Sequence, residues 1–335
     1  LSIKRSSTRN LIGYLRRKSQ RKKQEKGVGN RYKAILPLNT NEKVVDQFGW
    51  MPLSVIEPTK ESKNKWKNAY LNDGKEELRR GKNTKYLAGL KFSEFHAGLT
   101  ENILNYWSMV GSVVVDPFAG RVTRAYITNA LGREYYGYDA SPNTVERANR
   151  HLKENNMPSS VFLGDGCLME KTPNNFADLI MTCPPYHRLE KYESSDSQLS
   201  DIKEYDGFLQ KIQTCGENME RVLKPGGFLV WVCGDWRDGK EYRPFHSDCI
   251  SLFKEAGLIY HDLIVMKNHS PFAALQMGKV AAKRYTSKIH EFILVFRKEG
   301  ELIPASNVIK ETNFNEIVHK QTNEQGDLFT EIEVF

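Results

Sequence analysis

The sequence predicts an α/β fold built on a mostly parallel sheet with helices on both faces. From about residue 110, short runs rich in β-branched and aromatic residues alternate with segments of helical length. Such alternation is typical of parallel strands joined by helical crossovers. The 335 residues are enough for one large domain or two ordinary domains with a sizeable core.

The expected strands and helices follow one another through the middle of the chain. Seven strands are expected at residues 112–116, 134–138, 160–164, 177–183, 227–233, 258–266 and 290–297. Four helices are expected at residues 121–131, 141–154, 204–223 and 245–256. The second helix has Ser141 as N-cap and Pro142 in its first turn. A polar, basic loop without a helical pattern precedes the last strand, which we therefore expect to be antiparallel.

Charge divides the chain into four predicted segments. Residues 1–33 carry a net +11 and are expected to form a basic, flexible arm, whereas residues 299–335 carry a net −6 and form an acidic C-terminal tail. Between them we expect an N-terminal extension at 34–90 and a domain at 91–298 that contains the predicted strands and helices. A basic arm suits nucleic acid, but it is also compatible with a solvated tail without a partner.

Composition argues against several classes of protein. The mean hydropathy is −0.56, and no apolar run approaches the roughly 18 residues of a membrane span. The five cysteines are widely spaced, with no CxxC pair, and are expected to be reduced thiols in an intracellular, cytoplasmic protein. The histidines have no metal-ligand spacing, so no metal site is expected.

The carboxyl ends of the first four expected strands carry the candidate site residues. In chain order these ends read Asp116-Pro117-Phe118-Ala119-Gly120, Asp139, Asp165 and Cys183-Pro184-Pro185-Tyr186. Ligands of doubly wound sheets bind at the carboxyl ends of the strands. A single aspartate there is usually a cap or a turn former, but four consecutive strands ending this way predict one common site.

Three of these residues suit an adenosine-containing cofactor. Gly120 lets the backbone approach a ligand closely. Asp139 can accept both ribose hydroxyls, and Asp165 can accept from an adenine amino group. No GxGxxG follows the first strand, so the pattern is not that of a dinucleotide-binding protein.

The turn after the fourth strand suits a flat group that bears an amino substituent. Pro184 and Pro185 have restricted φ angles and lack backbone N–H donors. The turn therefore offers a rigid pair of carbonyl acceptors beside the aromatic face of Tyr186.

The two turns together resemble motifs of a known family. Asp116-Pro117-Phe118-Ala119-Gly120 and Cys183-Pro184-Pro185-Tyr186 resemble motifs I and IV of the S-adenosylmethionine-dependent amino-methyltransferases, which modify N6 of adenine or N4 of cytosine in DNA. Residues 92–112 resemble motif X, and Leu223-Lys224-Pro225-Gly226-Gly227 is typical of the superfamily. The order X, I, IV is that of unpermuted members. The likeness covers residues 50–298 and is greatest to stand-alone DNA modification methylases of phages and prophages.

This resemblance implies a Rossmann-like class I methyltransferase with a mostly parallel seven-stranded sheet and an antiparallel last strand. S-adenosylmethionine would be the cofactor, bound by residues 116–120, Asp139 and Asp165. Residues 91–298 would form the methyltransferase domain. DNA would be the partner, and the extension at 34–90 would be an element that contacts it. The target base would flip onto the catalytic turn formed by Cys183, Pro184, Pro185 and Tyr186. A role in DNA modification or restriction-modification, at the nucleoid of a bacterial or phage-infected cell, is implied as well.

The resemblance leaves several alternatives open. Cys183 stands where the group usually carries Asp, Asn or Ser, so either Thr182 or the backbone carbonyls take over as acceptors, or the site is weakened. Motif I commonly continues Gly-Ser-Gly, whereas Arg121 and Val122 follow Gly120 here. The alternative functions are an RNA guanine-N2 methyltransferase and a non-catalytic nucleic-acid-binding subunit. The sequence does not distinguish adenine from cytosine, and it does not indicate the oligomeric state.

Three further segments have candidate roles. Residues 187–202 are expected to form a lid over the base pocket or a plain surface loop. Residues 269–288 either contact phosphates or form a solvated loop. The peptide Gln325-Gly326-Asp327-Leu328-Phe329 resembles those that dock bacterial sliding clamps, although a tail that packs on the core is the alternative.

Overall fold

The computed structural model describes residues 52–57, 65–70, 95–158, 160–187, 199–267 and 280–302, together with Val44, Phe48 and Trp50. The chain divides into two compact units, Leu1–Pro52 and Leu53–Phe335, and every element below belongs to the second. The predicted basic arm, the clamp-like peptide, most of the predicted lid and residues 268–279 of the basic loop lie outside the described residues. None of the described helices is long and apolar enough to cross a membrane.

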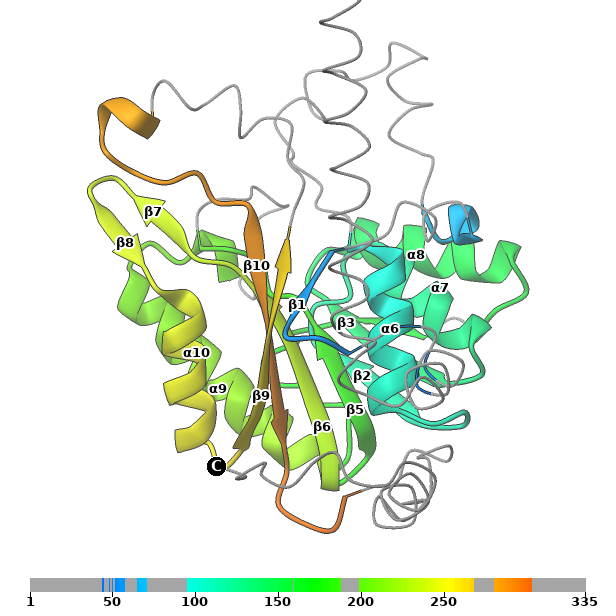
Figure 1. Cartoon of the computed structure of the whole chain (residues 1–335). Coiled ribbons are helices and arrows are strands. Elements are labelled where there is room, and N and C mark those ends of the chain that lie inside the picture. Colours follow the sequence, from blue (N-terminus) through cyan, green and yellow to red (C-terminus); the bar gives the residue numbers. More distant parts are fainter. Residues whose placement is uncertain are drawn as a thin grey trace, which may run out of the picture. The chain divides into compact units, whose positions relative to one another are not determined.

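An eight-stranded sheet forms the centre of this unit (Figure 1), with the strand order β1-β9-β10-β6-β5-β2-β3-β4. The strands are β1 (Val55–Ile56), β2 (Val113–Asp116), β3 (Glu134–Asp139), β4 (Val161–Leu163), β5 (Ala177–Thr182), β6 (Leu223–Cys233), β9 (Ile259–Lys267) and β10 (His290–Arg297). Strand β10 runs antiparallel to both β6 and β9, whereas all the other pairs are parallel. The predicted mostly parallel sheet with an antiparallel last strand is therefore confirmed.

The prediction of seven strands is wrong by one, because β1 adds a strand at the edge of the sheet. Val55 lies beside Val265 and Ile56 beside Met266 in a parallel pair, and the Val265 N–H donates to the Ser54 carbonyl at 2.8 Å. Two residues are too few to produce an alternating pattern, so this strand could not be predicted from hydrophobic periodicity. Part of the predicted extension 34–90 thus belongs to the sheet.

A small hairpin outside the main sheet was also not predicted. Strands β7 (Trp236–Asp238) and β8 (Glu241–Arg243) pair antiparallel. Gly239, in the two-residue loop between them, has φ 60°, a conformation that glycine adopts without steric cost.

Helices cover both faces of the sheet (Figure 1). Helices α6 (Ala97–Trp107), α7 (Thr123–Ala130) and α8 (Pro142–Glu154) lie on one side, and α9 (Tyr205–Val222) and α10 (Phe245–Glu255) lie on the other. The Ser141 hydroxyl accepts from the Thr144 N–H at 3.2 Å and Pro142 occupies the first turn of α8, as the sequence predicts. Helix α6 lies within the segment that resembles motif X.

The segment before α6 is attached to that helix through Glu101. The Trp66 indole donates to Glu101 Oε2 at 2.6 Å, and Lys65 forms an ion pair with the other carboxylate oxygen. The Tyr70 hydroxyl accepts from the Ala97 N–H at 3.1 Å, in the first turn of α6. This described part of the predicted extension therefore packs on the catalytic domain.

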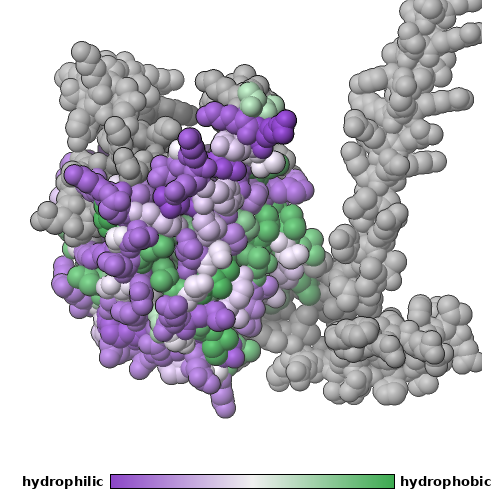
Figure 2. All heavy atoms as spheres, turned by 90° about the vertical axis from the view of Figure 1, so that its left-hand side faces the viewer, coloured by the Kyte–Doolittle hydropathy of each residue, from purple (hydrophilic) through white to green (hydrophobic). Residues whose placement is uncertain are grey.

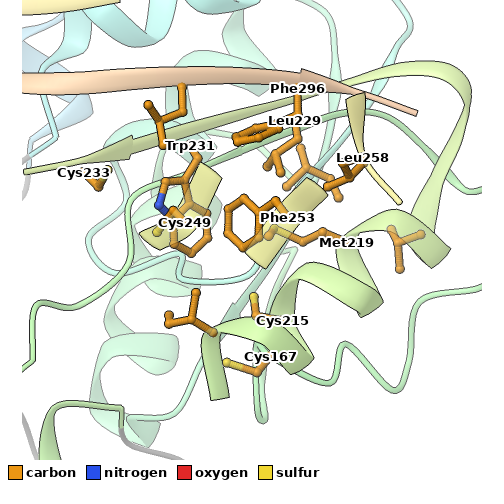
Figure 3. Close-up of a cluster of buried hydrophobic side chains, with 14 of the residues drawn as sticks. Cys167, Cys215, Met219, Leu229, Trp231, Cys233, Cys249, Phe253, Leu258 and Phe296 are labelled. Carbon is orange, nitrogen blue, oxygen red and sulfur yellow. The ribbon is translucent and has the colours of Figure 1, made fainter. Parts of the chain in front are cut away.

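An aromatic core holds α9 and α10 against the strands (Figure 3). The fully buried Trp231 ring of β6 meets the Phe253 ring of α10 edge to face, with centroids 4.9 Å apart. Phe253 also packs on Phe296 of β10 at 5.3 Å. Gly216 of α9 makes room for Phe253, because a Cβ there would lie 2.7 Å from the ring. Four of the five cysteines are buried free thiols in this cluster, namely Cys167, Cys215, Cys233 and Cys249.

The topology places a switch point between β2 and β5. From β2 the chain continues outward to β3 and β4, and it then returns to form β5 on the opposite side of β2. The connections that leave β2 and β5 therefore diverge at the carboxyl edge of the sheet. This switch point is where ligands of doubly wound sheets bind, and both predicted motif turns lie there.

Candidate active site

Asp116, the last residue of β2, joins four elements through hydrogen bonds. Its fully buried carboxylate accepts from the Tyr135 hydroxyl of β3 at 2.8 Å and from the Thr182 hydroxyl of β5 at 2.6 Å. It also accepts from the Phe118 N–H at 3.1 Å and from Arg124 Nε of α7 at 2.6 Å. Asp116 has no surface to offer a ligand, so we infer that its part in cofactor binding is to hold residues 117–120 in place.

Arg124 is a site residue that the sequence prediction missed. Its guanidinium is buried, pairs with Asp116 and donates to the carbonyls of Phe118 and Ala119. It also lies 4.6 Å from the centre of the Phe95 ring, so the segment before α6 packs on the same turn. Burial alone would lower the pKa of Arg124, but the charge and hydrogen bond of Asp116, together with smaller contributions from Tyr135 and Cys183, raise the pKa above its ordinary value. A charged residue on the buried face of α7 was the available signal.

Asp139, at the end of β3, connects the first two strand ends. Its Oδ2 accepts from the Gly120 N–H at 3.0 Å, and its Oδ1 accepts from the Ser141 N–H at 2.9 Å. Burial raises its pKa to about 6, although the two backbone N–H bonds oppose the shift. Each oxygen of an ionised carboxylate has a second lone pair, so Asp139 retains the capacity to accept two ribose hydroxyls.

Asp165, after β4, forms an ion pair with α9. Its Oδ1 accepts from the Cys167 N–H at 2.9 Å, and Lys211 Nζ lies 2.6 Å from its Oδ2. Burial tends to lower the pKa of Lys211, but Asp165 raises it above its ordinary value. Lys211 stands 46 residues from Asp165 in the sequence, so its role could not be read from local spacing.

The turn after β4 packs tightly against the turn after β2. A Cβ at Gly166 would lie 1.7 Å from the Pro117 carbonyl oxygen, which no side chain tolerates. Gly120 has φ 53°, and among the described residues, apart from its two chain neighbours, only the Phe118 carbonyl oxygen lies within 4 Å of the place where its Cβ would stand. The backbone at Gly120 is thus open on the side where a ligand would approach.

The Pro-Pro turn follows β5 directly beside the Asp116 turn. The Thr182 hydroxyl is buried and donates to Asp116, so we infer that it does not replace the acceptor that Cys183 lacks. The Cys183 Sγ is half-buried and lies 4.0 Å from the Pro184 carbonyl oxygen. The backbone carbonyls of this turn are then the acceptors, or the site is weakened, and these two alternatives stay predictions.

Tyr186 lies between this turn and the β7–β8 hairpin. Its ring meets the Trp236 ring edge to face, with centroids 5.8 Å apart. A Cβ at Gly234 would lie 3.3 Å from the Tyr186 hydroxyl, so a glycine there lets the phenol pack against the end of β6. The half-buried Tyr186 ring is therefore held in place by its packing against Trp236 and the backbone at Gly234.

His187 anchors the end of the turn. Its side chain is 2% exposed, and Nε2 donates to the Ile202 carbonyl, just after η2 (Leu199–Asp201), at 2.9 Å. The imidazole packs against the rings of Tyr205 and Phe208. These contacts indicate that His187 shapes the turn. Residues 188–198 of the predicted lid lie outside the described residues.

The sheet order and this site define a Rossmann-like methyltransferase of class I, the predicted fold class. The sequence model of the DNA methylase family N6_N4_Mtase matches residues 3–150 and 177–332, and the chain belongs to that family. This membership confirms the resemblance on which the sequence interpretation was based.

Individual relatives match shorter parts of the chain. The type II methyltransferase M.MthZI of Methanothermobacter thermautotrophicus is 26% identical over 158 residues, 42% of this chain and 44% of that protein. The orphan methyltransferase M.BamHII of Bacillus amyloliquefaciens is 30% identical over 122 residues, 36% of this chain and 38% of that protein. The chain therefore spans less than half the length of each of these two relatives.

Solved structures with a similar course of the chain are remote in sequence. TrmN from Thermus thermophilus has a TM-score of 0.42 at 16% identity, covering 61% of this chain and 49% of that one. The geranyl diphosphate C-methyltransferase of Streptomyces coelicolor has a TM-score of 0.45 at 13% identity, covering 60% of this chain and 80% of that one.

S-adenosylmethionine is the cofactor of this methyltransferase family, and the residues present fit it. Gly120 gives an open backbone, Asp139 offers two remaining acceptor positions for ribose hydroxyls, and the Asp165 carboxylate stands at the next strand end. The cofactor supplies an electrophilic methyl group on a sulfonium. Among the described residues, no three histidine, cysteine or acidic side chains are grouped so as to hold a metal ion.

Proposed function

We propose that the protein transfers a methyl group from S-adenosylmethionine to an exocyclic amino nitrogen in DNA, N6 of adenine or N4 of cytosine. The observation that carries the proposal is the Cys183–Tyr186 turn. It stands next to the cofactor turn and combines backbone carbonyl acceptors with an aromatic face. Family membership and the type II methyltransferase relatives support DNA as the substrate class.

The chemistry requires orientation and charge stabilisation. The amine lone pair is delocalised into the base, so the nitrogen is a weak nucleophile. The carbonyls at Cys183 and Pro184 accept from its hydrogens and favour the more tetrahedral, positively charged nitrogen of the transition state. A bond forms between this nitrogen and the methyl carbon while the carbon–sulfur bond breaks and its electrons remain on sulfur. The nitrogen then loses a proton to water.

Tyr186 supplies the platform for the target base. The amino group is not reachable in line inside a duplex, so the base must leave the stack at a cost of about a few kcal/mol. Stacking on an aromatic ring returns roughly 1–3 kcal/mol of this. Trp236 and Gly234 pack against the Tyr186 ring, so the ring keeps its position next to the catalytic turn when no base is present.

A Tyr186→Ala variant tests this assignment. Loss of the stacking surface should reduce methyl transfer to DNA by about fivefold to about 150-fold. Calorimetric affinity for S-adenosylmethionine should stay unchanged, and Tyr186→Phe, which keeps the ring, should retain most of the rate. Transfer of tritiated methyl groups to DNA and RNA, with mass spectrometry of the nucleosides, identifies the modified atom.

Normal methylation by Tyr186→Ala would contradict the site. Methylation of RNA guanine alone would replace the proposed substrate. Failure of the wild-type protein to bind S-adenosylmethionine would favour a non-catalytic nucleic-acid-binding subunit.

A further inference from the structure

A cluster of basic and aromatic side chains lies beside Tyr186, on two segments that the chemistry above does not use. Arg237 and Tyr242 belong to the β7–β8 hairpin, whereas Tyr285 and Lys288 belong to the segment that leads into β10. Figure 1 shows the hairpin and this segment on the same side of the sheet. The face in Figure 2, which includes the hairpin, is predominantly hydrophilic. We call these four residues the Arg237 cluster.

A buried carboxylate anchors the hairpin that carries half of the cluster. The Asp235 side chain is 2% exposed and accepts from the Tyr242 hydroxyl at 2.8 Å and from the His246 N–H at 3.1 Å. The His246 ring lies 2.8 Å from Asp235 through Nδ1 and stacks on Phe292 of β10 at 4.0 Å. The hairpin is therefore tied to both α10 and β10 and does not depend on a ligand for its position.

The hairpin also links the cluster to the catalytic turn. Trp236 is 6% exposed and packs on Tyr186, Phe208 and Phe245. Successive side chains of a strand point to opposite faces, so Arg237 faces outward, and it is exposed. The ring that supports Tyr186 and the first cation of the cluster thus belong to consecutive residues, Trp236 and Arg237.

Two residues of the segment before β10, Tyr285 and Lys288, contact the hairpin. The turn of this segment is closed by the Tyr285 N–H, which donates to the Val280 carbonyl at 3.0 Å, and Arg284 has φ 55°. The Arg237 guanidinium lies 3.7 Å from the centre of the Tyr285 ring, and Lys288 Nζ lies 4.1 Å from the centre of the Tyr242 ring. The Arg237 guanidinium is thus held on the Tyr285 face, whereas Lys288 Nζ donates to the Tyr242 hydroxyl oxygen.

Neither cation of the cluster forms an ion pair with a described residue, although the buried Asp235 lies near Lys288 and bonds to the same Tyr242 hydroxyl. The neighbouring Arg243, in contrast, pairs with Glu241 at 2.6 Å. Burial lowers the pKa of Lys288. The negative charge of Asp235 opposes this lowering, whereas the positive charge of Arg237 lowers the pKa further by repulsion. Two cations that repel each other favour an anion between them.

The form of the cluster favours a phosphate over a base as its ligand. A ring that already carries a cation on its face is less free to stack on a base, whereas the N–H groups of the cation still donate outward. Guanidinium groups bind phosphate oxygens in a bidentate manner, and ammonium groups bind them as point charges. The position beside Tyr186 matches the backbone next to a base that has left the stack.

We propose that the Arg237 cluster binds the phosphodiester backbone of the DNA strand next to the flipped base and so positions that strand over the catalytic turn. The inference rests on the proposed DNA methyltransferase function. It assigns Arg237 and Lys288 as two phosphate contacts and Tyr242 and Tyr285 as the side chains that hold them.

The salt dependence of DNA binding tests this directly. For duplex DNA, each lost phosphate contact lowers the slope of log K against log salt by about 0.9. An Arg237→Gln, Lys288→Gln double variant should therefore lose about 1.8 from the slope, and its affinity at ~0.15 M salt should fall about 30-fold. The probe is a short fluorescent duplex in the presence of S-adenosylhomocysteine. In turnover assays KM for DNA should rise by a similar factor while kcat changes little.

Lys254→Gln is the control for one lost surface charge, because Lys254 lies in the last turn of α10, away from the hairpin. It should leave both the slope and KM unchanged. S-adenosylmethionine titrations of both variants should match the wild type, which shows that the fold and the cofactor site are intact. If the double variant methylates and binds DNA with the slope and KM of Lys254→Gln, the cluster proposal is overturned while the proposed function stands. If the wild-type protein transfers no methyl group to DNA, the proposed function fails, and the cluster proposal fails with it.

Discussion

The pKa of Asp139 predicts how cofactor affinity depends on pH. In the free protein, burial holds this pKa at about 6. Ribose hydroxyls donate hydrogen bonds, so they bind the ionised carboxylate and lower its pKa further. Binding therefore releases a proton from the fraction of molecules that is protonated, and affinity must fall as the pH drops through about 6.

The magnitude follows from the same value. With a pKa of about 6, the ionised share of Asp139 falls from about 97% at about pH 7.5 to about 9% at about pH 5. If only the ionised form binds the ribose, the dissociation constant of S-adenosylmethionine rises about tenfold over this range, or about 1.4 kcal/mol. Above about pH 7 the curve should be flat.

Isothermal titration calorimetry at a series of pH values measures this curve, and Asp139→Asn provides the comparison. The amide does not ionise, so the variant should bind more weakly near neutral pH and lose the pH-dependent step that belongs to Asp139. Other titrating groups act on both proteins alike and cancel in the ratio. A flat wild-type curve, or an equally steep curve for Asp139→Asn, would refute the role of Asp139 in ribose binding.

Two further substitutions address the turns themselves. Gly166→Ala would place a Cβ 1.7 Å from the Pro117 carbonyl oxygen and should lower the free energy of unfolding by about 3 kcal/mol or more in urea denaturation; Gly164→Ala, whose Cβ would make an ordinary 3.7 Å contact, should cost less than about 1 kcal/mol. Equal stability of the two variants would contradict the close packing of the turns. At the base site, Cys183→Ala should retain kcat within about threefold, and Cys183→Ser, a better acceptor, should raise it up to about fivefold. Complete loss of activity in Cys183→Ala would instead assign the thiol a direct part in the reaction.

The fold and the positions of the motif turns at the strand ends could be predicted because their signals are local. A strand that ends in Asp-Pro-Phe-Ala-Gly or Cys-Pro-Pro-Tyr combines a buried apolar run with a turn of recognisable composition. Parallel pairing then brings the carboxyl ends of such strands to one edge without any knowledge of their contacts. The position of Asp139 and the cap at Ser141 followed from the same kind of evidence.

Two of the site contacts could not be predicted because their partners are distant in sequence, whereas the missed Arg124 pairs with Asp116 only eight positions away. Lys211 meets Asp165 across 46 positions, and Thr182 meets Asp116 across 66. The two-residue β1 and the short hairpin are stabilised by pairing and by the buried Asp235 more than by their own propensity. Helix α6 was not predicted as a helix, because its residues were interpreted only as part of the segment that resembles motif X.

The hydrogen bond between Thr182 and Asp116 separates two parts of the chain around the Pro-Pro turn that differ in how freely their side chains can be substituted. Up to residue 182 the side chains serve the cofactor turn, because the Thr182 hydroxyl completes the buried Asp116 network. From Cys183 onward they belong to the proposed base site. A change of target base could therefore proceed by substitutions from residue 183 outward without loss of the methyl donor, whereas a change at Thr182 would disturb both ligands together. An engineer seeking new base specificity would begin at residue 183.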